Sequence, residues 1–129
     1  MAAMGQAPAM HELSVAYNIV EIAAGAARDA GVTQVGTVHL RLGAMSGVEQ
    51  EPLRFGYGIA IEGTCLAGSR LVIEDVPLTI FCPTCGTERV VENVQVLRCP
   101  ACGTPSMDIR SGRELEIAYL EYDDESANP

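Results

Sequence analysis

The chain has 129 residues and carries 17 acidic side chains against 8 basic ones, all of them arginine, so its formal net charge is −9. This length suits one compact domain with a small satellite, and a hydrophobic share of 48% excludes an intrinsically disordered chain. No apolar run approaches the ~18 residues of a membrane span. The acidic balance argues against a protein that binds the phosphate backbone of nucleic acids.

Small residues and one proline fill residues 1–9, which indicates a disordered extension. This segment lacks the charged region and the apolar core of a secretory signal, so we expect the protein to remain in the cytoplasm. Thiols stay reduced in the cytoplasm, and clustered cysteines there indicate metal or redox sites rather than disulfides.

Hydrophobic periodicity predicts two helices and three strands. Apolar residues at three- and four-residue steps indicate a helix over about 12–30, and strict alternation indicates a strand over 35–43. A second helix is expected from Pro52 until Gly63, followed by strands at 70–76 and 114–121. Gly56 and Gly58 weaken that second helix by about 1 kcal/mol each relative to alanine, and we interpret them as allowing close packing on the sheet.

The fold class predicted from this order is α+β, a small three-stranded sheet with two helices and an inserted zinc-ribbon-like domain. Residues 10–76 and 110–122 form the α/β domain, residues 77–109 form the insertion, and residues 123–129 form an acidic tail.

Four cysteines in the insertion occupy two identical patterns, each a Cys-Pro-x-Cys-Gly knuckle, at Cys82, Cys85, Cys99 and Cys102. Two intervening residues let both sulfurs of a tight turn face one centre, and two such turns offer the four thiolates of a structural zinc site. A block of this size cannot bury a core sufficient to fold alone. Zinc binding, which is worth on the order of 10–16 kcal/mol in small peptides, can organise it.

Other roles for these cysteines fit less well. A thioredoxin-like redox pair should start a helix after a strand, and neither knuckle does. A zinc deaminase needs His-x-Glu and Pro-Cys-x-x-Cys, whereas His11 and Glu12 are adjacent here and each proline follows its cysteine. A nucleic-acid-binding ribbon would need more bases than Arg89 and Arg98. Cys65 stands apart and is expected to be an inert thiol.

The sequence contains two histidines. His39 lies on the polar face of the strand at 35–43, where a solvated or hydrogen-bonded role is expected. His11 lies in Met10-His11-Glu12, just before the first helical stripe. An imidazole combined with a free α-amine and deprotonated backbone amides gives a square-planar nitrogen set that suits Ni²⁺ or Cu²⁺. A lone histidine near a terminus is also often a cap or a surface residue.

Several of these segments occur together in a known family. The segment Met-His-Glu-Leu-Ser-Val-Ala at 10–16 resembles the start of the HypA/HybF family of nickel metallochaperones for hydrogenase maturation. Val-His-Leu-Arg-Leu-Gly at 38–43, Pro-Leu-Arg-Phe at 52–55, the paired knuckles and Gly-Arg-Glu-Leu-Glu-Ile at 112–117 follow in the family's order. The resemblance covers about residues 10–122.

The resemblance implies a nickel domain with an attached zinc domain. It assigns nickel to the imidazole and backbone nitrogen of His11 and to the backbone of Glu12, with Glu49 as an approximate match to a further acidic position. It assigns structural zinc to the four cysteines, and it implies two partners, an accessory nickel GTPase and the large subunit of a [NiFe] hydrogenase. No nucleic acid and no membrane are expected as partners, and the implied role is not enzymatic.

One departure from the family concerns the nine residues before Met10, because with them present residue 10 has no free amine. Either Met10 is the true start, or nickel binds through His11 and backbone amides alone. The function predicted is delivery of Ni(II) for hydrogenase maturation. The alternative is a zinc-ribbon scaffold or regulatory protein without a nickel role.

Overall fold

The computed structural model describes the backbone of residues 3–123 and the side chains of residues 11–123. The chain divides into two compact units. Of the described residues, the first unit comprises 3–40, 48–73 and 116–123, and the second comprises 41–47 and 74–115. The second unit therefore contains the whole cysteine block together with the adjoining ends of three strands.

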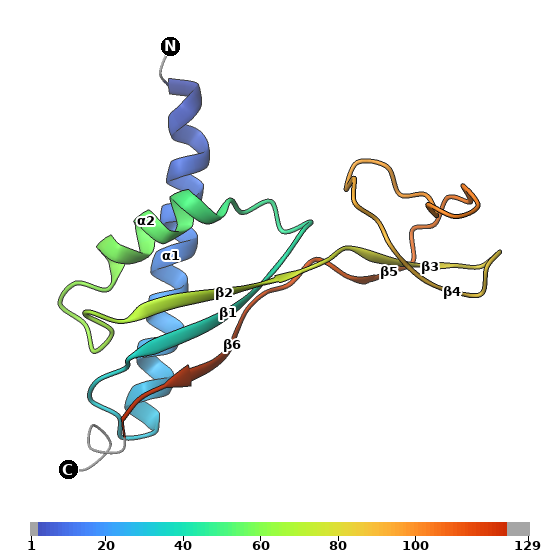
Figure 1. The fold of residues 1–129 in the computed structure, drawn as a ribbon. Coiled ribbons are helices and arrows are strands. Elements are labelled where there is room, and N and C mark those ends of the chain that lie inside the picture. Colours follow the sequence, from blue (N-terminus) through green and yellow to red (C-terminus); the bar gives the residue numbers. More distant parts are fainter. Residues whose placement is uncertain (1–2, 124–129) are drawn as a thin grey trace. The chain divides into compact units, whose positions relative to one another are not determined.

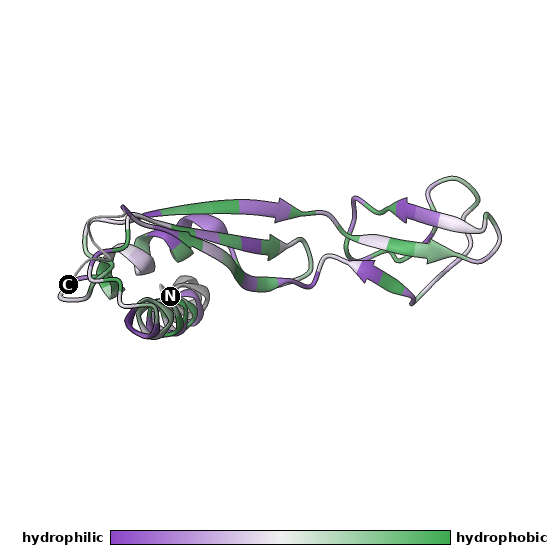
Figure 2. Ribbon diagram, turned by 90° about the horizontal axis from the view of Figure 1, so that it is seen from below, coloured by the Kyte–Doolittle hydropathy of each residue, from purple (hydrophilic) through white to green (hydrophobic). Residues whose placement is uncertain are grey.

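Two helices cover one face of the sheet in the first unit (Figures 1 and 2). Helix α1 spans Ala3–Asp29 and helix α2 spans Gln50–Ala60. The apolar stripes of both helices and the inward-facing residues of the sheet form one hydrophobic core. The alternating pattern over residues 35–43 predicted the strand that faces this core. The largest fully buried side chains of the core are Val35, Val38, Leu40, Leu53 and Leu66.

Helix α1 begins earlier than the sequence pattern predicted. The expected start was near residue 12, after a loose extension over residues 1–9, but the helix already begins at Ala3. Apart from one glycine and one proline, this segment consists of alanine, methionine and glutamine, which have high helix propensity. The expectation of a disordered extension therefore does not hold for residues 3–9, and residues 1–2 lie outside the described part.

The other end of α1 follows the expectation. Gly31 adopts a φ of 74°, a left-handed conformation that favours glycine. The N–H of Val32 donates to the carbonyl of Ala27 at 2.8 Å, and the N–H of Gly31 donates to Arg28 at 3.1 Å. These bonds form the Schellman pattern that satisfies the last carbonyls of a helix.

The sheet that the two helices cover has the strand order β2-β1-β6. Its strands are β2 at Arg70–Val76, β1 at Thr37–Gly43 and β6 at Leu115–Glu121. Strands β1 and β2 are parallel, since Arg70 N–H donates to Gly36 and Ala44 N–H donates to Val76. All three predicted strands are present, and Val38, Leu40 and Leu42 are buried as the alternation required.

Strand β6 runs antiparallel to β1. Gly36 N–H donates to the carbonyl of Glu121 at 2.8 Å, and Gly43 N–H donates to that of Glu114 at 2.7 Å. The C-terminal strand thereby completes the sheet that the first strand began, so the cysteine block lies in the chain between two strands of this sheet. Among the described residues, no helix is both long and apolar enough to cross a membrane.

The second unit contains its own sheet, of order β4-β3-β5, from strands Thr87–Val90, Thr79–Cys82 and Ile109–Ser111. Both pairings are antiparallel. The hydrophobic cluster is small: Leu78, Ile80 and Val91 are buried, whereas Val90 and Val96 are about half exposed at 53% and 45%.

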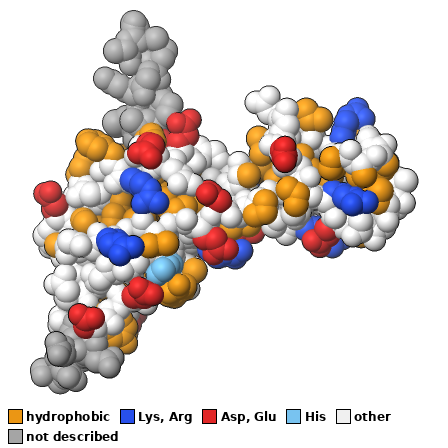
Figure 3. Space-filling model, in the orientation of Figure 1, with side chains coloured by type: hydrophobic (Ala, Val, Ile, Leu, Met, Phe, Trp, Pro, Cys, Tyr) orange, Lys and Arg blue, Asp and Glu red, His pale blue; other side chains and the backbone are white. Residues whose placement is uncertain are grey.

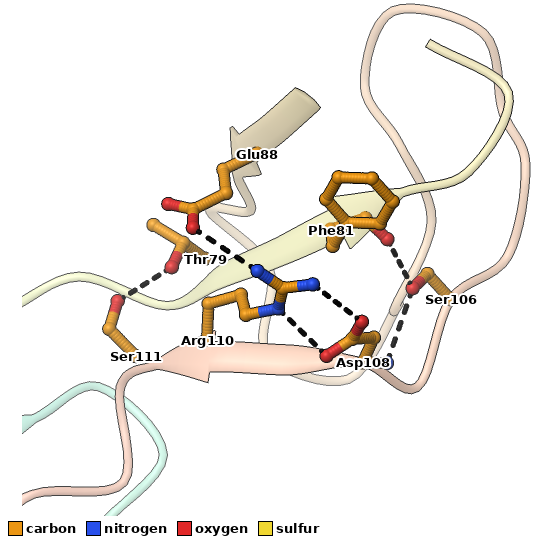
Figure 4. Close-up of polar contacts among 7 residues, drawn as sticks. All are labelled: Thr79, Phe81, Glu88, Ser106, Asp108, Arg110 and Ser111. Atoms are coloured by element: carbon orange, nitrogen blue, oxygen red, sulfur yellow. Dashed lines mark hydrogen bonds and ion pairs between the residues drawn. The ribbon is translucent and has the colours of Figure 1, made fainter. Parts of the chain in front are cut away.

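Polar contacts hold β5 against β3 and β4 (Figure 4). The Arg110 guanidinium forms two bonds of 2.9 Å to the Asp108 carboxylate, lies 3.6 Å from Glu88, and covers the Phe81 ring at 4.7 Å. The Ser106 hydroxyl donates to the Phe81 carbonyl at 2.6 Å. Polar and cation–π contacts therefore supplement a core that is too small to define this unit alone.

Gly56 and Gly58 of α2 have different surroundings. A Cβ atom at Gly56 would lie 3.2 Å from Ala16 Cβ and 3.3 Å from Leu13 Cα, both on α1, whereas nothing lies within 4 Å at Gly58. Gly56 therefore permits close approach of the two helices, and the expectation that it packs on the sheet was wrong.

This difference predicts opposite effects of alanine at the two positions. Gly58→Ala should raise the free energy of unfolding by about 0.5–1 kcal/mol, because it improves helix propensity in open space. Gly56→Ala should lower it by about 1–3 kcal/mol, because Ala16 and Leu13 of α1, at 3.2 and 3.3 Å, must shift by a few tenths of an ångström to admit the methyl group. Urea unfolding measures both changes, and stabilisation by Gly56→Ala would contradict the packing described.

Candidate metal centres

Two tight turns bring the four cysteines of the second unit together. The first knuckle leaves the end of β3, where Gly86 N–H donates to the Cys82 carbonyl at 2.7 Å. The second repeats the arrangement, with Gly103 N–H donating to Cys99 at 2.8 Å. Gly86 and Gly103 have φ values of 70° and 81°, so each turn needs its glycine.

Backbone amides of these turns point at sulfur. Cys85 N–H donates to Cys82 Sγ at 3.3 Å, and Ala101 N–H donates to Cys99 Sγ at 3.4 Å. Such bonds stabilise the thiolate over the thiol, because they supply positive charge to the sulfur. The two knuckles therefore position the sulfurs and also favour their anionic form.

The four sulfurs lie within 4.8 Å of one another. Cys82 Sγ is 3.5 Å from Cys102 Sγ, and Cys85 Sγ is 3.9 Å from Cys99 Sγ. A tetrahedral zinc ion with Zn–S bonds of about 2.3 Å places its sulfurs about 3.8 Å apart. The geometry and the donor type therefore both fit zinc, and no other group of three or more potential ligands converges within the described residues.

Threonines at the exposed side connect the two knuckles. The Thr104 hydroxyl lies 3.1 Å from Cys102 Sγ and donates to the Thr84 hydroxyl at 2.9 Å. Contact with Thr104 lowers the pKa of the Cys102 thiol. This bridge joins residues that are twenty positions apart, and it supports the position of an exposed ligand.

The close sulfurs alter one another's protonation. Arg89 lowers the pKa of Cys85, but contacts with the other three sulfurs and burial raise it, with a net value of about 11. Burial raises the pKa of Cys99, but backbone donors and neighbouring sulfurs outweigh it and bring the value to about 6. The cluster thus holds protons that a cation would displace, so metal binding should release protons.

The first unit contains the residues expected to bind nickel. His11 is exposed, whereas the adjacent Glu12 is 1% exposed. Both lie inside α1, where backbone N–H groups take part in the helical hydrogen-bond ladder. The square-planar arrangement predicted from the sequence requires deprotonated amides, so it requires unwinding of the turn of α1 that precedes His11.

The Glu12 carboxylate caps the second helix. Its Oε2 atom accepts a hydrogen bond of 2.8 Å from the N–H of Glu49, the residue that precedes α2. The Glu49 side chain itself makes no capping bond. A carboxylate at the positive end of a helix is stabilising, so Glu12 connects the start of α2 to the turn of α1 that carries His11. Glu12 Oε1 is buried without a hydrogen-bond partner among the described atoms.

His39 and Cys65 lie in places consistent with structural roles. The His39 ring stacks on Tyr119 with centroids 4.0 Å apart, and its Nε2 atom lies 3.3 Å from the Glu121 carboxylate. Cys65 is half-buried and packs against the core of the first unit. Neither residue joins a group of potential metal ligands within the described part of the chain.

The chain matches, over residues 10–122, the family model described as hydrogenase/urease nickel incorporation, metallochaperone, HypA. The chain belongs to this family. The match begins at the Met-His-Glu segment and covers both knuckles.

Curated relatives agree with this assignment. A hydrogenase maturation factor HypA of Chloroflexus aggregans is 54% identical over 112 residues, covering 87% of this chain and 98% of the relative. That of Roseiflexus sp. is 50% identical over 117 residues, covering 91% and 95%. The solution structure of the Ni metallochaperone HypA from Helicobacter pylori shares the fold, with a TM-score of 0.60 at 18% identity, covering 85% of this chain and 95% of that one.

Sequence reasoning missed two features of these sites. Glu12 was expected to contribute its backbone only, and nothing in local spacing connects it to Glu49, which lies 37 positions away. Arg89 was considered only as one of two bases in the cysteine block, whereas it lowers the pKa of the Cys85 thiol. The alternation of β4 after the first knuckle could have suggested that Arg89 shares a face with Cys82.

The cap predicts a stability effect at Glu12. Glu12→Ala should lower the free energy of unfolding of the first unit by about 2 kcal/mol, because the N–H of Glu49 loses a charged acceptor. Glu21→Ala, at an exposed position of the same helix, should change it by less than about 0.5 kcal/mol. Thermal and urea unfolding provide the comparison, and equal effects of the two variants would argue against the cap.

Proposed function

We propose that this protein is a nickel metallochaperone that delivers Ni(II) for maturation of a [NiFe] hydrogenase. The observation that carries the proposal is the exposed imidazole of His11 at the start of the family match. The named function of the relatives supports it. The recipients implied by the resemblance are an accessory nickel GTPase and, finally, the large subunit of the hydrogenase.

Nickel is the cargo in this proposal. The His11 imidazole, the backbone nitrogen of His11 and that of Glu12 supply nitrogen donors, which suit square-planar Ni²⁺. The imidazole is exposed, so a recipient can approach and replace the ligands one at a time. Transfer then follows from the higher affinity of the recipient, and it needs no catalytic group in this chain.

The four-cysteine site holds Zn(II) in a structural role in the same proposal. Four protein sulfurs complete a tetrahedron and leave no coordination position for a substrate. Cys82 and Cys99 are buried, at 0% and 2% exposure, which hinders exchange. We assign no enzymatic activity to the chain, and we place it in the cytoplasm, where the thiolates remain reduced.

The surface fits this role better than nucleic-acid binding. On the face that Figure 3 shows, arginine side chains are scattered among acidic ones rather than gathered in a stripe. With a net charge of −9, the chain should attract cations and basic partners.

The two histidines provide a matched test of the nickel site. His11→Ala should weaken nickel binding by more than the roughly 10–100-fold expected for loss of an outer-shell partner, while one zinc per chain remains. His39→Ala should leave nickel binding unchanged, because His39 is engaged with Tyr119 and Glu121. Isothermal titration with nickel, combined with elemental analysis for zinc, measures both.

Equal nickel affinity in His11→Ala and wild type would place the cargo elsewhere. If the wild-type protein holds zinc but no nickel, the alternative remains, a zinc-ribbon scaffold or regulatory protein.

The residues before Met10 provide a second test. A chain that begins at Met10 gains a free amine beside His11 and no longer has to unwind the preceding turns of α1. It should bind nickel at least about tenfold more tightly than the 129-residue chain, a gain of about 1.4 kcal/mol. Competition with a nickel chelator measures the ratio. Equal affinities would show that His11 and backbone amides suffice without the amine.

A further inference from the structure

The outer face of α2 exposes two large apolar side chains. Phe55 is 74% exposed and Ile59 is 42% exposed, and residues four positions apart lie on one side of a helix. The buried residues of α2 lie on its other side and are Leu53, Gly56, Tyr57 and Ala60. Single exposed apolar residues are ordinary on a protein surface, whereas neighbouring ones that cover no core indicate a contact surface.

Gly58 belongs to the same outer face, three positions after Phe55. Nothing lies within 4 Å of the place where its Cβ atom would be, and its φ is not in the left-handed region that favours glycine. Glycine weakens a helix relative to alanine. Neither packing within the described chain nor backbone conformation therefore accounts for a glycine at this position.

The inner glycine of the same helix shows what such a position permits. A Cβ atom at Gly56 would lie 3.2 Å from Ala16 Cβ, so α1 packs close to the backbone of α2 there. Gly58 comes two positions later, about 200° further round the helix, and leaves a similar gap on the outside. A gap with Phe55 and Ile59 beside it fits the side-chain ridge of another helix.

The charge of the first unit specifies the flanks of such a helix. Its described side chains include nine acidic ones against three arginines, compared with six against five in the second unit. Glu51 and Glu62 are exposed at the two ends of α2, where Figure 3 shows acidic side chains beside hydrophobic ones. The base of α2, Arg54, donates to the Leu71 carbonyl at 2.6 Å and is thereby held at the sheet. The complement of this surface is therefore basic.

We propose that the outer face of α2 docks an amphipathic helix of a partner protein, which has an apolar stripe and basic residues on its flanks. Apolar side chains of the partner fill the gap at Gly58 and cover Phe55 and Ile59, and its basic side chains approach Glu51 and Glu62. Anchors at i, i+3 and i+4 are typical of recognition between helices. The surface contains none of the proposed metal residues, so it can be tested without nickel.

Fluorescence anisotropy with a labelled synthetic peptide tests this surface on the full-length protein. The probe is an amphipathic helix of about 18 residues, or five turns, with leucine at helical spacing and arginine on both flanks. It should bind at least about tenfold more tightly than a scrambled peptide of the same composition, which keeps the charge but has no apolar face.

Two exposed isoleucines provide matched variants. Ile59→Ser should weaken binding of the amphipathic peptide about tenfold, because it truncates a central apolar anchor. Ile22→Ser removes an isoleucine that is 64% exposed on α1, and its affinity should stay within about twofold of wild type.

Gly58→Ala separates docking from folding. Its methyl group should weaken peptide binding at least about threefold, because it fills the gap, while the unfolding temperature rises through improved helix propensity. A variant that folds better and binds worse does not have its binding defect from misfolding.

The inference is overturned if the scrambled peptide binds as tightly as the amphipathic one, or if Ile59→Ser and Ile22→Ser bind the peptide equally. Sedimentation of the wild-type protein examines a different occupant. A dimer that Ile59→Ser dissociates would mean that a second copy of this chain covers α2, and it would also overturn the proposal. None of these outcomes depends on whether nickel binds.

Discussion

Convergence of four sulfurs is the constraint on which the second unit depends. Its apolar cluster has three buried side chains, Leu78, Ile80 and Val91, each worth about 1.5–3 kcal/mol on burial. A core of three buried side chains is too small to fold a block of this size alone. Zinc at a four-sulfur site contributes on the order of 10–16 kcal/mol. On the proposed assignment, the ion is a folding element, which is a physical reason for a closed site.

In the first unit, apolar burial rather than metal binding provides the free energy of folding. Two helices and the sheet bury a continuous core that includes Val38, Leu40 and Leu53, so this unit needs no ion to fold. The proposed nickel-binding residue, His11, can therefore remain exposed, and the ion that it binds can be weakly held. A permanent ion and a transient one make incompatible demands on coordination, and the chain meets them with separate groups of residues.

The sequence predicted the features that depend on local patterns. Strand alternation located the buried face of β1, and Gly31 ended α1 as expected, because side-chain period and glycine conformation are local properties. The start of α1 was missed because an alanine-rich segment without an apolar stripe shows no periodicity. The packing of Gly56 and the cap by Glu12 were missed because each depends on a partner far away in sequence.

The Glu12 cap bears on how a nickel site can form within a continuous helix. On the proposed assignment, coordination by the amides of His11 and Glu12 replaces their helical hydrogen bonds to residues 7 and 8, so the turn of α1 before His11 must unwind when nickel binds. The Glu12 side chain is held by the N–H of Glu49, outside α1, and does not depend on the preceding turns. Unwinding from the N-terminus can therefore reach His11 while the carboxylate keeps the new helix start against α2. In this proposal the buried acid limits how far the helix opens, and the exposed imidazole beside it lies at the start of the ordered helix.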